Sequence, residues 1–454
     1  MDYSEFLTQK KHTSGKFGFE PCYMPSQAFD FQQQIIEDCL QHGRYAGFID
    51  TGLGKTLIEL TIAQNCAQVT NKRVLIITPL AVAYQFIDEA ERFDICSPVY
   101  SKDGSLNSDI VICNYERLDK FNPDDFDTVI LDESSILKNF DGKIKAQVTA
   151  FLKRVKYRFL FTATPSPNDF IELGTSSEAL GYLGYTDMLG KFFTNNEDTV
   201  KPVNMGTKWV LKGHAEESFY EWVSSWSTSV RKPRDLGFSD DRHVLPELLV
   251  NKIEVDNRNI LDIDGQCEMF ARPSSRLTEV RQEQKQTITE RCEKAAEVAH
   301  IHDTSVFWCN FNDEASTLSQ MIPDAKEIKG SMNIDNKEEL LIAFQRGEIK
   351  KLITKPKITC FGLNWQHCNH TVYFPTFSYE QYYQAIRRFW RFGQKNDVNV
   401  DMIYSNGQAK VIQSLMAKAD KADNLFSKLN TALNELEVNT DKDFKQKIIL
   451  PEFI

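Results

Sequence analysis

The sequence lacks long hydrophobic runs, closely paired cysteines and internal repeats. No apolar run among its 454 residues approaches the roughly 18 to 20 residues that a membrane-spanning helix needs. The N-terminus shows no basic start followed by an apolar stretch, so we expect no secretory signal. Ten cysteines are scattered without a Cys-x-x-Cys pair, which favours reduced thiols in the cytoplasm. These absences predict a soluble, intracellular protein with no membrane partner. The length of 454 residues predicts two or three domains.

Positive charge is also scarce over the chain as a whole. The formal net charge is −11, from 53 Lys and Arg residues against 64 Asp and Glu residues. Because phosphate binding needs cations, this balance argues against a protein that coats nucleic acid nonspecifically. A local basic track is still compatible with it, since residues 349–395 hold eight basic residues and one acidic residue.

The chain contains two blocks in which apolar strands alternate with helices. Short runs rich in β-branched residues are typical of buried parallel strands, and helical segments such as 56–67 and 81–93 separate them. This alternation predicts an α/β fold with two doubly wound parallel sheets. The expected strands include 74–77, 110–113, 128–131 and 159–161 in the first block, and 305–309, 351–354 and 370–374 in the second.

A different sequence pattern separates the two blocks. Five apolar residues in this middle follow the spacing i, i+3, i+4, i+7, i+11, so we expect one helix face to carry and bury them. After residue 408 the chain looks like a polar, amphipathic helical tail. The five apolar residues are Phe219, Trp222, Val223, Trp226 and Val230. The expected organisation is lobe 1 at 1–170, a helical insertion and linker at 171–280, lobe 2 at 281–408 and the tail at 409–454.

A glycine-rich loop at residues 50–56 follows a short strand and precedes a helix. Its glycines permit close approach of the backbone to a phosphate chain, and N–H groups converge at the start of the helix. Lys55 is expected to reach the β- and γ-phosphates, and the Thr56 hydroxyl to hold Mg²⁺. Ile49 occupies the first position of the full G-x-x-x-x-G-K-T pattern, which leaves G-x-G-K-T. The loop predicts a site for ATP and Mg²⁺ formed by Gly52, Leu53, Gly54, Lys55 and Thr56.

Two adjacent acids, Asp132 and Glu133, end the apolar strand at 126–131. A nucleotide hydrolase needs one carboxylate near the magnesium ion and another to deprotonate the attacking water. Since ligands bind at the carboxyl ends of parallel strands, Asp132 is the expected metal partner and Glu133 the expected base. Thr162 and Thr164 follow another strand, and their hydroxyls are candidates to couple the acids to the γ-phosphate. An ordinary strand-to-turn exit is the alternative for these threonines.

A pair of arginines in the second block completes the candidate chemistry. Arg388 and Arg391 are three residues apart, so on a helix they would point the same way. Two guanidinium groups aimed at one point stabilise the charge that develops on a transferred phosphoryl group. If they act there, the nucleotide binds between the two blocks. A basic surface helix is the alternative.

The order of these motifs resembles that of the Swi/Snf-like family of superfamily-two helicase ATPases, over about residues 27–400. Residues 52–56 match its G-L-G-K-T, and 132–139 resemble D-E-x-H-x-x-K-N. Residues 162–165 resemble T-x-T-P, and 384–394 resemble Q-A-x-x-R-x-x-R-x-G-Q. Further similarities lie at Arg231, Lys232, Asp235, Leu245, Pro246, Gly330, Ser331, Phe344 and residues 362–364.

The resemblance implies two RecA-like lobes that hydrolyse ATP to move along double-stranded DNA, usually without separating the strands. By this resemblance Gln32 contacts the adenine, Gly362 and Gln384 belong to the nucleotide site, and Gln394 joins Thr162 and Thr164 in coupling. The residues expected to contact DNA are Thr78, Pro79, Asn114 and Tyr115 in lobe 1, and Thr354 and Lys355 in lobe 2.

Two departures from the family pattern qualify this picture. Ser135 stands where family members usually carry a histidine, so the coupling between ATP and the Thr162–Thr164 segment is expected to differ. The chain also lacks long insertions, which favours a minimal viral or bacterial member that works with replication or repair proteins in the cytoplasm of a bacterial or phage-infected cell. The alternative functions are a strand-separating or branch-migrating DNA helicase and a nucleotide-gated DNA-binding clamp.

Overall fold

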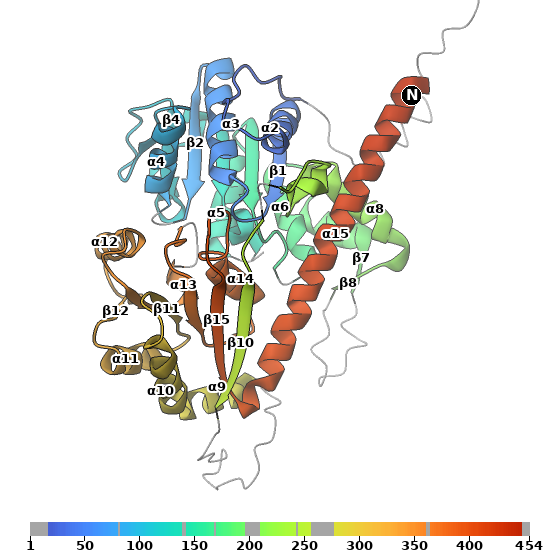
Figure 1. Cartoon of the computed structure of the whole chain (residues 1–454). Helices are drawn as coiled ribbons and strands as arrows, with labels where there is room; N and C mark the ends of the chain where they lie inside the picture. Colours follow the sequence, from blue (N-terminus) through green and yellow to red (C-terminus); the bar gives the residue numbers. More distant parts are fainter. Residues whose placement is uncertain are drawn as a thin grey trace, which may run out of the picture. The chain divides into compact units, whose positions relative to one another are not determined.

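The computed structural model describes residues 17–79, 82–138, 142–167, 169–195, 209–241, 244–255, 277–359 and 364–446. The chain forms two compact units. Unit 1 takes in residues 1–79, 83–242 and 422–454, and unit 2 takes in residues 80–82 and 243–421. Each unit contains a parallel sheet with helices packed beside it (Figure 1).

The sheet of unit 1 has seven parallel strands in the order β3-β4-β2-β5-β6-β1-β9. Its central strands are buried along almost their whole length, because helices cover both faces of such a sheet. β6 lies between β1, which leads into the glycine loop, and β5, which ends in the acid pair. The strands are β1 (Arg44–Ile49), β2 (Arg73–Thr78), β3 (Val99–Tyr100), β4 (Ile110–Asn114), β5 (Phe126–Asp132), β6 (Tyr157–Thr162) and β9 (Ser227–Val230).

The helices of unit 1 pack on this sheet. α3 has buried residues around most of its circumference, as expected for a helix enclosed by its neighbours. A short antiparallel pair, β7 (Phe193–Asn195) and β8 (Trp209–Leu211), extends the helical part of the unit. The helices are α2 (Asp30–His42), α3 (Lys55–Thr70), α4 (Ala83–Phe93), α5 (Lys143–Leu152), α6 (Leu173–Leu180), α7 (Tyr185–Phe192) and α8 (Glu216–Ser224).

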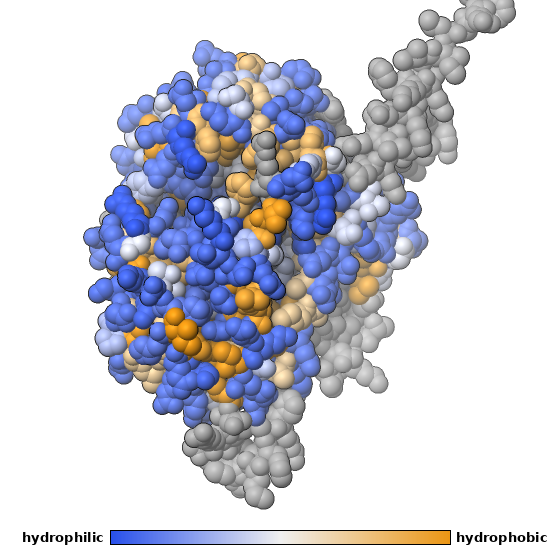
Figure 2. Space-filling view, viewed as in Figure 1, coloured by the Kyte–Doolittle hydropathy of each residue, from blue (hydrophilic) through white to orange (hydrophobic). Residues whose placement is uncertain are grey.

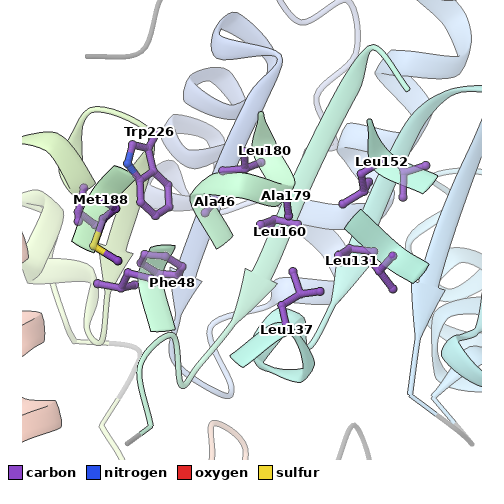
Figure 3. Packing of buried hydrophobic residues seen from close by; sticks show 14 of the residues in the cluster. Ala46, Phe48, Leu131, Leu137, Leu152, Leu160, Ala179, Leu180, Met188 and Trp226 are labelled. Carbon is purple, nitrogen blue, oxygen red and sulfur yellow. The ribbon is translucent and has the colours of Figure 1, made fainter. Parts of the chain in front are cut away.

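The largest apolar core of unit 1 lies under the strands that carry the candidate site. Phe48 of β1, Leu131 of β5 and Leu160 of β6 are all fully buried, and Met188 and Trp226 pack into the same cluster (Figure 3). Full burial of a Leu or Phe side chain contributes roughly 1.5 to 3 kcal/mol. This packing fixes the carboxyl ends of the three strands from which the glycine loop, the acid pair and Thr162 emerge.

The five apolar residues at 219–230 are buried as expected, but the prediction that one helix carries them is wrong. α8 ends at Ser224, and Val230 lies on β9, which pairs with β1. Serine side chains end the helix, because the hydroxyl of Ser227 donates to the carbonyl of Val223 at 2.8 Å. The chain then finds its backbone partners in the sheet instead of in another helical turn.

The sheet of unit 2 has six parallel strands in the order β10-β15-β14-β11-β13-β12. Its edge strand β10 comes from the stretch 171–280, so that stretch supplies a strand to each of the two sheets. The strands are β10 (Leu248–Val255), β11 (Ser305–Trp308), β12 (Lys326–Glu327), β13 (Lys351–Thr354), β14 (His370–Tyr373) and β15 (Val398–Ser405). The helices are α9 (Leu277–Gln286), α10 (Ile288–Ala299), α11 (Asn312–Met321), α12 (Ile334–Gln345), α13 (Pro356–Thr359) and α14 (Tyr379–Ile386).

The expected helical tail is α15 (Ala409–Gln446). Residues up to 421 belong to unit 2, where the Lys418 ammonium donates to the carbonyl of Phe377 at 2.7 Å. Later residues belong to unit 1, and Leu425, Phe426 and Leu429 are buried in its core. Two parallel-sheet lobes of the RecA-like type, with a helical C-terminal segment, therefore confirm the fold class expected from the sequence.

The face of the molecule shown in Figure 2 is mainly hydrophilic. None of the described helices combines the length and the apolar character that crossing a bilayer requires. On the face shown in Figure 2, apolar residues form small groups among hydrophilic ones.

Candidate functional site

The glycine loop between β1 and α3 has the backbone of a phosphate-binding loop. Gly52 (φ 86°) and Gly54 (φ 80°) both adopt left-handed conformations, which side-chain-bearing residues rarely tolerate. A Cβ atom on Gly54 would lie 2.3 Å from the side-chain nitrogen of Gln32. α3 begins directly at Lys55, so the unpaired N–H groups and the positive end of its dipole face the loop. This cradle suits the phosphates of a nucleotide.

Two side chains hold the loop from opposite directions. The Gln32 amide of α2 donates to the carbonyl of Leu53 at 2.8 Å and accepts from the N–H of Phe29 at 2.9 Å. The Lys55 ammonium donates to the carbonyls of Ile49 at 2.9 Å and Asp50 at 3.4 Å. Desolvation lowers the pKa of Lys55, while the negative charges of Glu133 and Asp132 oppose this change.

The acid pair lies at the carboxyl end of β5 and is largely buried, with Asp132 8% and Glu133 6% exposed. Glu133 has a left-handed backbone (φ 57°), a conformation that costs roughly 1 to 2 kcal/mol for a residue with a side chain. Its Oε1 atom accepts hydrogen bonds from the hydroxyls of Thr162, at 2.7 Å, and Ser135, at 2.8 Å. The strained turn thus places the Glu133 carboxylate where two hydroxyls fix it.

The expected connection between the acids and the threonine segment is present as a chain of hydrogen bonds. The Thr162 hydroxyl donates to Glu133 and accepts from the N–H of Thr164 at 3.0 Å. Ser135, noted in the sequence as a departure from the family pattern, takes part directly because its hydroxyl also donates to Glu133. The sequence showed that this position was unusual, but it could not show that the serine would reach back to the carboxylate.

Sequence reasoning missed Glu59, a third carboxyl group near the loop. It lies on α3 and is fully buried, and neither oxygen has a hydrogen-bond partner among the described residues. Burial raises the pKa of Glu59 well above the usual carboxyl value, and the charge of Asp132 adds to this. The signal was a single glutamate inside the apolar run Leu57–Ile62. Burial therefore favours the neutral form of the Glu59 carboxyl group.

The residues of unit 1 expected to contact DNA lie at the same carboxyl edge of the sheet, at the ends of β2 and β4. The Asn114 amide donates to the carbonyl of Pro79 at 3.2 Å, and the Tyr115 hydroxyl donates to the carbonyl of Asp132 at 2.7 Å. Thr78 and Asn114 are fully buried, and Tyr115 nearly so. These side chains bind neighbouring backbone and shape the edge, and Tyr115 connects it to the acid pair.

In unit 2, Thr354 and Lys355 follow β13. Thr354 is fully buried, and its hydroxyl accepts a hydrogen bond from the hydroxyl of Thr359 at 3.2 Å. The Lys355 ammonium donates to the side chain of Asn312 at 2.5 Å and lines a cavity of about 530 Å³. Arg281 and Lys357 line the same cavity, so it is basic.

The prediction that a helix carries Arg388 and Arg391 is wrong. α14 ends at Ile386, and both arginines lie in the turn that follows. Tertiary partners take up the carbonyls that a longer helix would use, since the N–H of Trp365 donates to the carbonyl of Arg388 at 3.0 Å. The Arg388 side chain is 3% exposed and donates to the Gln384 side chain at 3.4 Å. Helical spacing therefore does not set the directions of the two guanidinium groups.

Gln394, expected to couple the two lobes, organises this turn within unit 2. Its amide nitrogen donates to the carbonyls of Gln366 at 3.1 Å, Cys368 at 3.2 Å and Phe389 at 3.3 Å. Its amide oxygen accepts from the N–H groups of Lys395 and Asn396. Gly362, expected in the nucleotide site, lies outside the described residues.

Among the described residues, one group of histidine and acidic side chains brings its ligand atoms close together: His302, His370 and Asp401 of unit 2. The two imidazole rings stack at 3.7 Å and 8°. Rings in this arrangement do not direct their in-plane lone pairs at one ion. Both nitrogens of His370 are also engaged, with Ser305 at 2.8 Å and Asp401 at 3.0 Å. The group is a buried polar network that connects β11, β14 and β15.

The two-unit fold and the site of unit 1 define a nucleotide-hydrolysing ATPase of the phosphate-loop type. Residues 29–172 match the DEAD/DEAH box helicase family, and residues 285–393 match the helicase conserved C-terminal domain. The two matches together take in more than half of the chain and lie in its two units. The chain therefore belongs to the helicase ATPases of superfamily two, as its motifs predicted.

Comparison with solved structures finds the Sulfolobus solfataricus SWI2/SNF2 ATPase core in complex with dsDNA. It is 18% identical, with a TM-score of 0.41, over 91% of this chain and 96% of that one. A comparison with curated proteins gave no significant match.

Proposed function

We propose that the protein is a Swi/Snf-like motor that hydrolyses ATP to move along double-stranded DNA. The observation that carries this proposal is the shared carboxyl edge of the unit 1 sheet. The glycine loop, the acid pair and the Thr78–Asn114 region all emerge there, at the ends of β1, β5, β2 and β4. The hydrogen bond from Tyr115 to the carbonyl of Asp132 joins the hydrolytic group to the expected DNA edge.

The residues present fit ATP and magnesium. The loop backbone and Lys55 would hold the phosphates, and the ammonium would exchange its bonds to Ile49 and Asp50 for phosphate oxygens. The Thr56 hydroxyl and Asp132 would hold Mg²⁺, which neutralises phosphate charge. Glu133, already fixed by Thr162 and Ser135, would deprotonate the attacking water.

The second unit would supply the remaining groups. Arg388 and Arg391 would stabilise the charge that develops on the transferred phosphoryl group, with Gly362 and Gln384 beside the nucleotide. Gln32 would contact the adenine, and this requires its amide to exchange the bond it makes to Leu53. Thr162, Thr164 and Gln394 would then report the state of the nucleotide to the DNA-binding edge.

Lys355 of the basic cavity would join the DNA track from unit 2, where Thr354 shapes the end of β13. The net charge of +7 over residues 349–395 supports a local track in an otherwise acidic chain. Under this proposal, the protein would work with bacterial or phage replication or repair proteins in the cytoplasm.

Displacement of a third DNA strand from a triplex tests the proposal, because it needs directional movement without separation of the duplex. We expect the wild-type protein to release the third strand with ATP, and Glu133→Gln to release none while its kcat falls about 10² to 10⁴-fold. Release should also fail with a nonhydrolysable ATP analogue.

Three other outcomes would decide against this function. DNA-stimulated ATP hydrolysis without triplex release would identify a nucleotide-gated clamp. Unwinding of a forked or tailed duplex would identify a strand-separating helicase. If no DNA stimulates ATP hydrolysis, DNA is not the partner on which the protein acts.

A further inference from the structure

An aromatic and basic cluster lies beside the carboxyl edge of the unit 1 sheet. We name it the β3 platform; it consists of Tyr84, Tyr100, Lys102 and Arg117. The Tyr84 and Tyr100 rings meet edge to face at 5.5 Å and 79°. The Lys102 ammonium lies 5.7 Å from the centre of the Tyr84 ring and 5.3 Å from that of Tyr100. The Arg117 guanidinium lies 5.8 Å from the Tyr100 ring and donates to its hydroxyl at 3.0 Å.

The loop that carries Lys102 is held in a defined shape. Gly104 has φ +93°, and a Cβ atom there would lie 2.7 Å from the carbonyl oxygen of Lys120. The Lys120 ammonium donates to the carbonyl of Lys102 at 2.7 Å, and the N–H of Gly104 donates to the Ser101 hydroxyl at 3.2 Å. Because the loop is fixed in this way, Lys102 is positioned before any ligand arrives.

The β3 platform is continuous with the edge that the proposed function gives to DNA. β3 pairs with β4, and Asn114 ends β4. The Tyr100 hydroxyl donates to the side chain of Asn114, whose amide donates to the carbonyl of Pro79. Thr78 and Asn114 are buried, whereas Tyr84 is 37% exposed. The platform therefore offers a side chain at the surface next to edge residues that are buried.

Two acidic residues are sequence neighbours of the platform's cations. Asp103 follows Lys102, but its carboxylate accepts bonds from the N–H of Ser105 at 3.0 Å and the hydroxyl of Ser101 at 3.4 Å. These bonds turn it into its own loop and lower its pKa. These bonds orient the Asp103 carboxylate without removing its charge. Glu116, next to Arg117, is exposed.

We propose that the β3 platform binds the sugar-phosphate backbone of one DNA strand. Lys102 and Arg117 pair with phosphates, and the exposed face of Tyr84 packs against the deoxyribose between them. A lysine and an arginine supported by aromatic rings suit phosphate recognition without base specificity. The inference rests on the proposed function, because it extends the DNA-binding edge of that motor.

Binding of a fluorescein-labelled blunt duplex, measured by anisotropy over a series of KCl concentrations, tests the platform. Lys102→Ala should weaken binding about three- to tenfold and make the slope of log K against log salt shallower by about one unit. Tyr84→Ala should weaken binding several-fold with the slope unchanged, since it removes packing and no charge. Tyr84→Phe should keep the wild-type affinity.

Lys72→Ala is the matched control. Lys72 is 66% exposed and directly precedes β2, at the amino edge of the same sheet. It removes the same charge from unit 1, so its salt slope should equal that of the wild type. Thermal unfolding of each variant, compared with the wild type, separates lost contacts from lost folding.

The outcomes separate this inference from the proposed function. If the wild-type protein does not bind the duplex, the proposed function fails. If the wild-type binds and Lys102→Ala keeps both its affinity and its salt slope, the β3 platform is overturned while the motor stands. Equal slope changes in Lys102→Ala and Lys72→Ala would also overturn it, because the effect would then follow net charge.

Discussion

In unit 1 the glycine loop and the acid pair follow the ends of strands, and Gln32 of α2 holds the loop, whereas in unit 2 the two arginines lie in a turn beyond the end of α14. Hydrogen bonds fix Glu133, Gln32 and Lys55 at the edge of the first sheet. In the second unit, five hydrogen bonds of one side chain, Gln394, hold the turn. Both units contain a parallel sheet, so they differ in the elements that carry the expected functional side chains.

Under the proposed function, this difference implies that the two units contribute differently to the reaction. A preformed phosphate cradle contributes to binding in the ground state as well as in the transition state. The unit 2 arginines would act where charge develops in the transition state, and they would raise the rate more than the affinity. Variants of the two units should therefore separate binding from turnover.

Arg391→Ala is expected to show the largest difference between its effect on turnover and its effect on nucleotide binding. Its kcat for ATP should fall about 10³-fold or more, because the guanidinium would stabilise charge on the transferred phosphoryl group. The affinity for a fluorescent ATP analogue should change little. Steady-state ATPase assays and equilibrium titrations measure the two quantities.

Lys395→Ala is the control for Arg391→Ala, since it removes a positive charge from an exposed residue four positions along the chain. It should keep wild-type turnover. If Arg391→Ala loses nucleotide affinity and rate to the same extent, the proposal that unit 2 acts mainly on the rate is wrong.

A smaller effect within unit 1 is expected for Ser135→Ala. The Glu133 carboxylate then keeps its bond to Thr162 but loses the one from Ser135, and a hydrogen bond to a charged group is worth about 1.5 to 3 kcal/mol. We expect kcat to fall about tenfold or more, with the KM for ATP nearly unchanged. Ser135→Thr, which keeps the hydroxyl, should restore most of the rate.

Ser134→Ala is the matched control for Ser135→Ala. Ser134 is 2% exposed, and its hydroxyl has no hydrogen-bond partner among the described residues. Removing this neighbouring buried hydroxyl should leave kcat near the wild-type value. Equal losses in the two alanine variants would show that packing, and not the bond to Glu133, sets the rate.

The smallest effect concerns Glu59 and the stability of unit 1. Its pKa is raised in the folded protein, so the folded state keeps a proton that the unfolded chain releases above the ordinary carboxyl value of 4.5. Stability therefore falls as pH rises from that value towards the folded-state pKa. Glu59→Gln removes this dependence and should raise the unfolding midpoint by roughly 2 to 4 °C at pH 8.

At pH 5 the same substitution should change the unfolding midpoint much less. At this pH the folded protein has lost little of the stability that the raised pKa of Glu59 removes at higher pH. The exposed Glu91 on α4 gives a control, and Glu91→Gln should show no such pH dependence. A gain that is equal at pH 5 and pH 8 would mean that Glu59 is not held neutral by burial. Calorimetry at the two pH values measures both variants.

Local sequence determined the parts of the site that depend on one loop and its flanking strands. The Gly52–Thr56 loop and the acids after β5 could be found because their residue types and the adjoining apolar strands carry the signal together. Parallel strands then bring their carboxyl ends to one edge without further information. By the same reasoning, the sequence predicts that Thr162 lies near the acid pair, and its hydroxyl donates to Glu133.

The misplaced elements depended on partners far along the chain. The helix expected through residues 219–230 gave way to β9 because β1 offered a free sheet edge. The helix expected to carry Arg388 ends early because Trp365 and Gln394 take up its carbonyls. Neither partner is visible in a periodic pattern. The β3 platform could not be predicted from the sequence for the same reason, since its four residues come from three separate segments.

The division of α15 between the two units has a consequence for biosynthesis. Leu425, Phe426 and Leu429 lie in the core of unit 1, although the rest of that unit is complete by residue 242. During translation, unit 2 and most of the C-terminal helix must leave the ribosome before these side chains can close the core. At about 5 to 20 residues per second, the nascent first unit waits roughly 10 to 40 seconds with part of its apolar surface uncovered. Docking of the later part of α15 therefore follows synthesis of unit 2, and it completes the apolar core of unit 1.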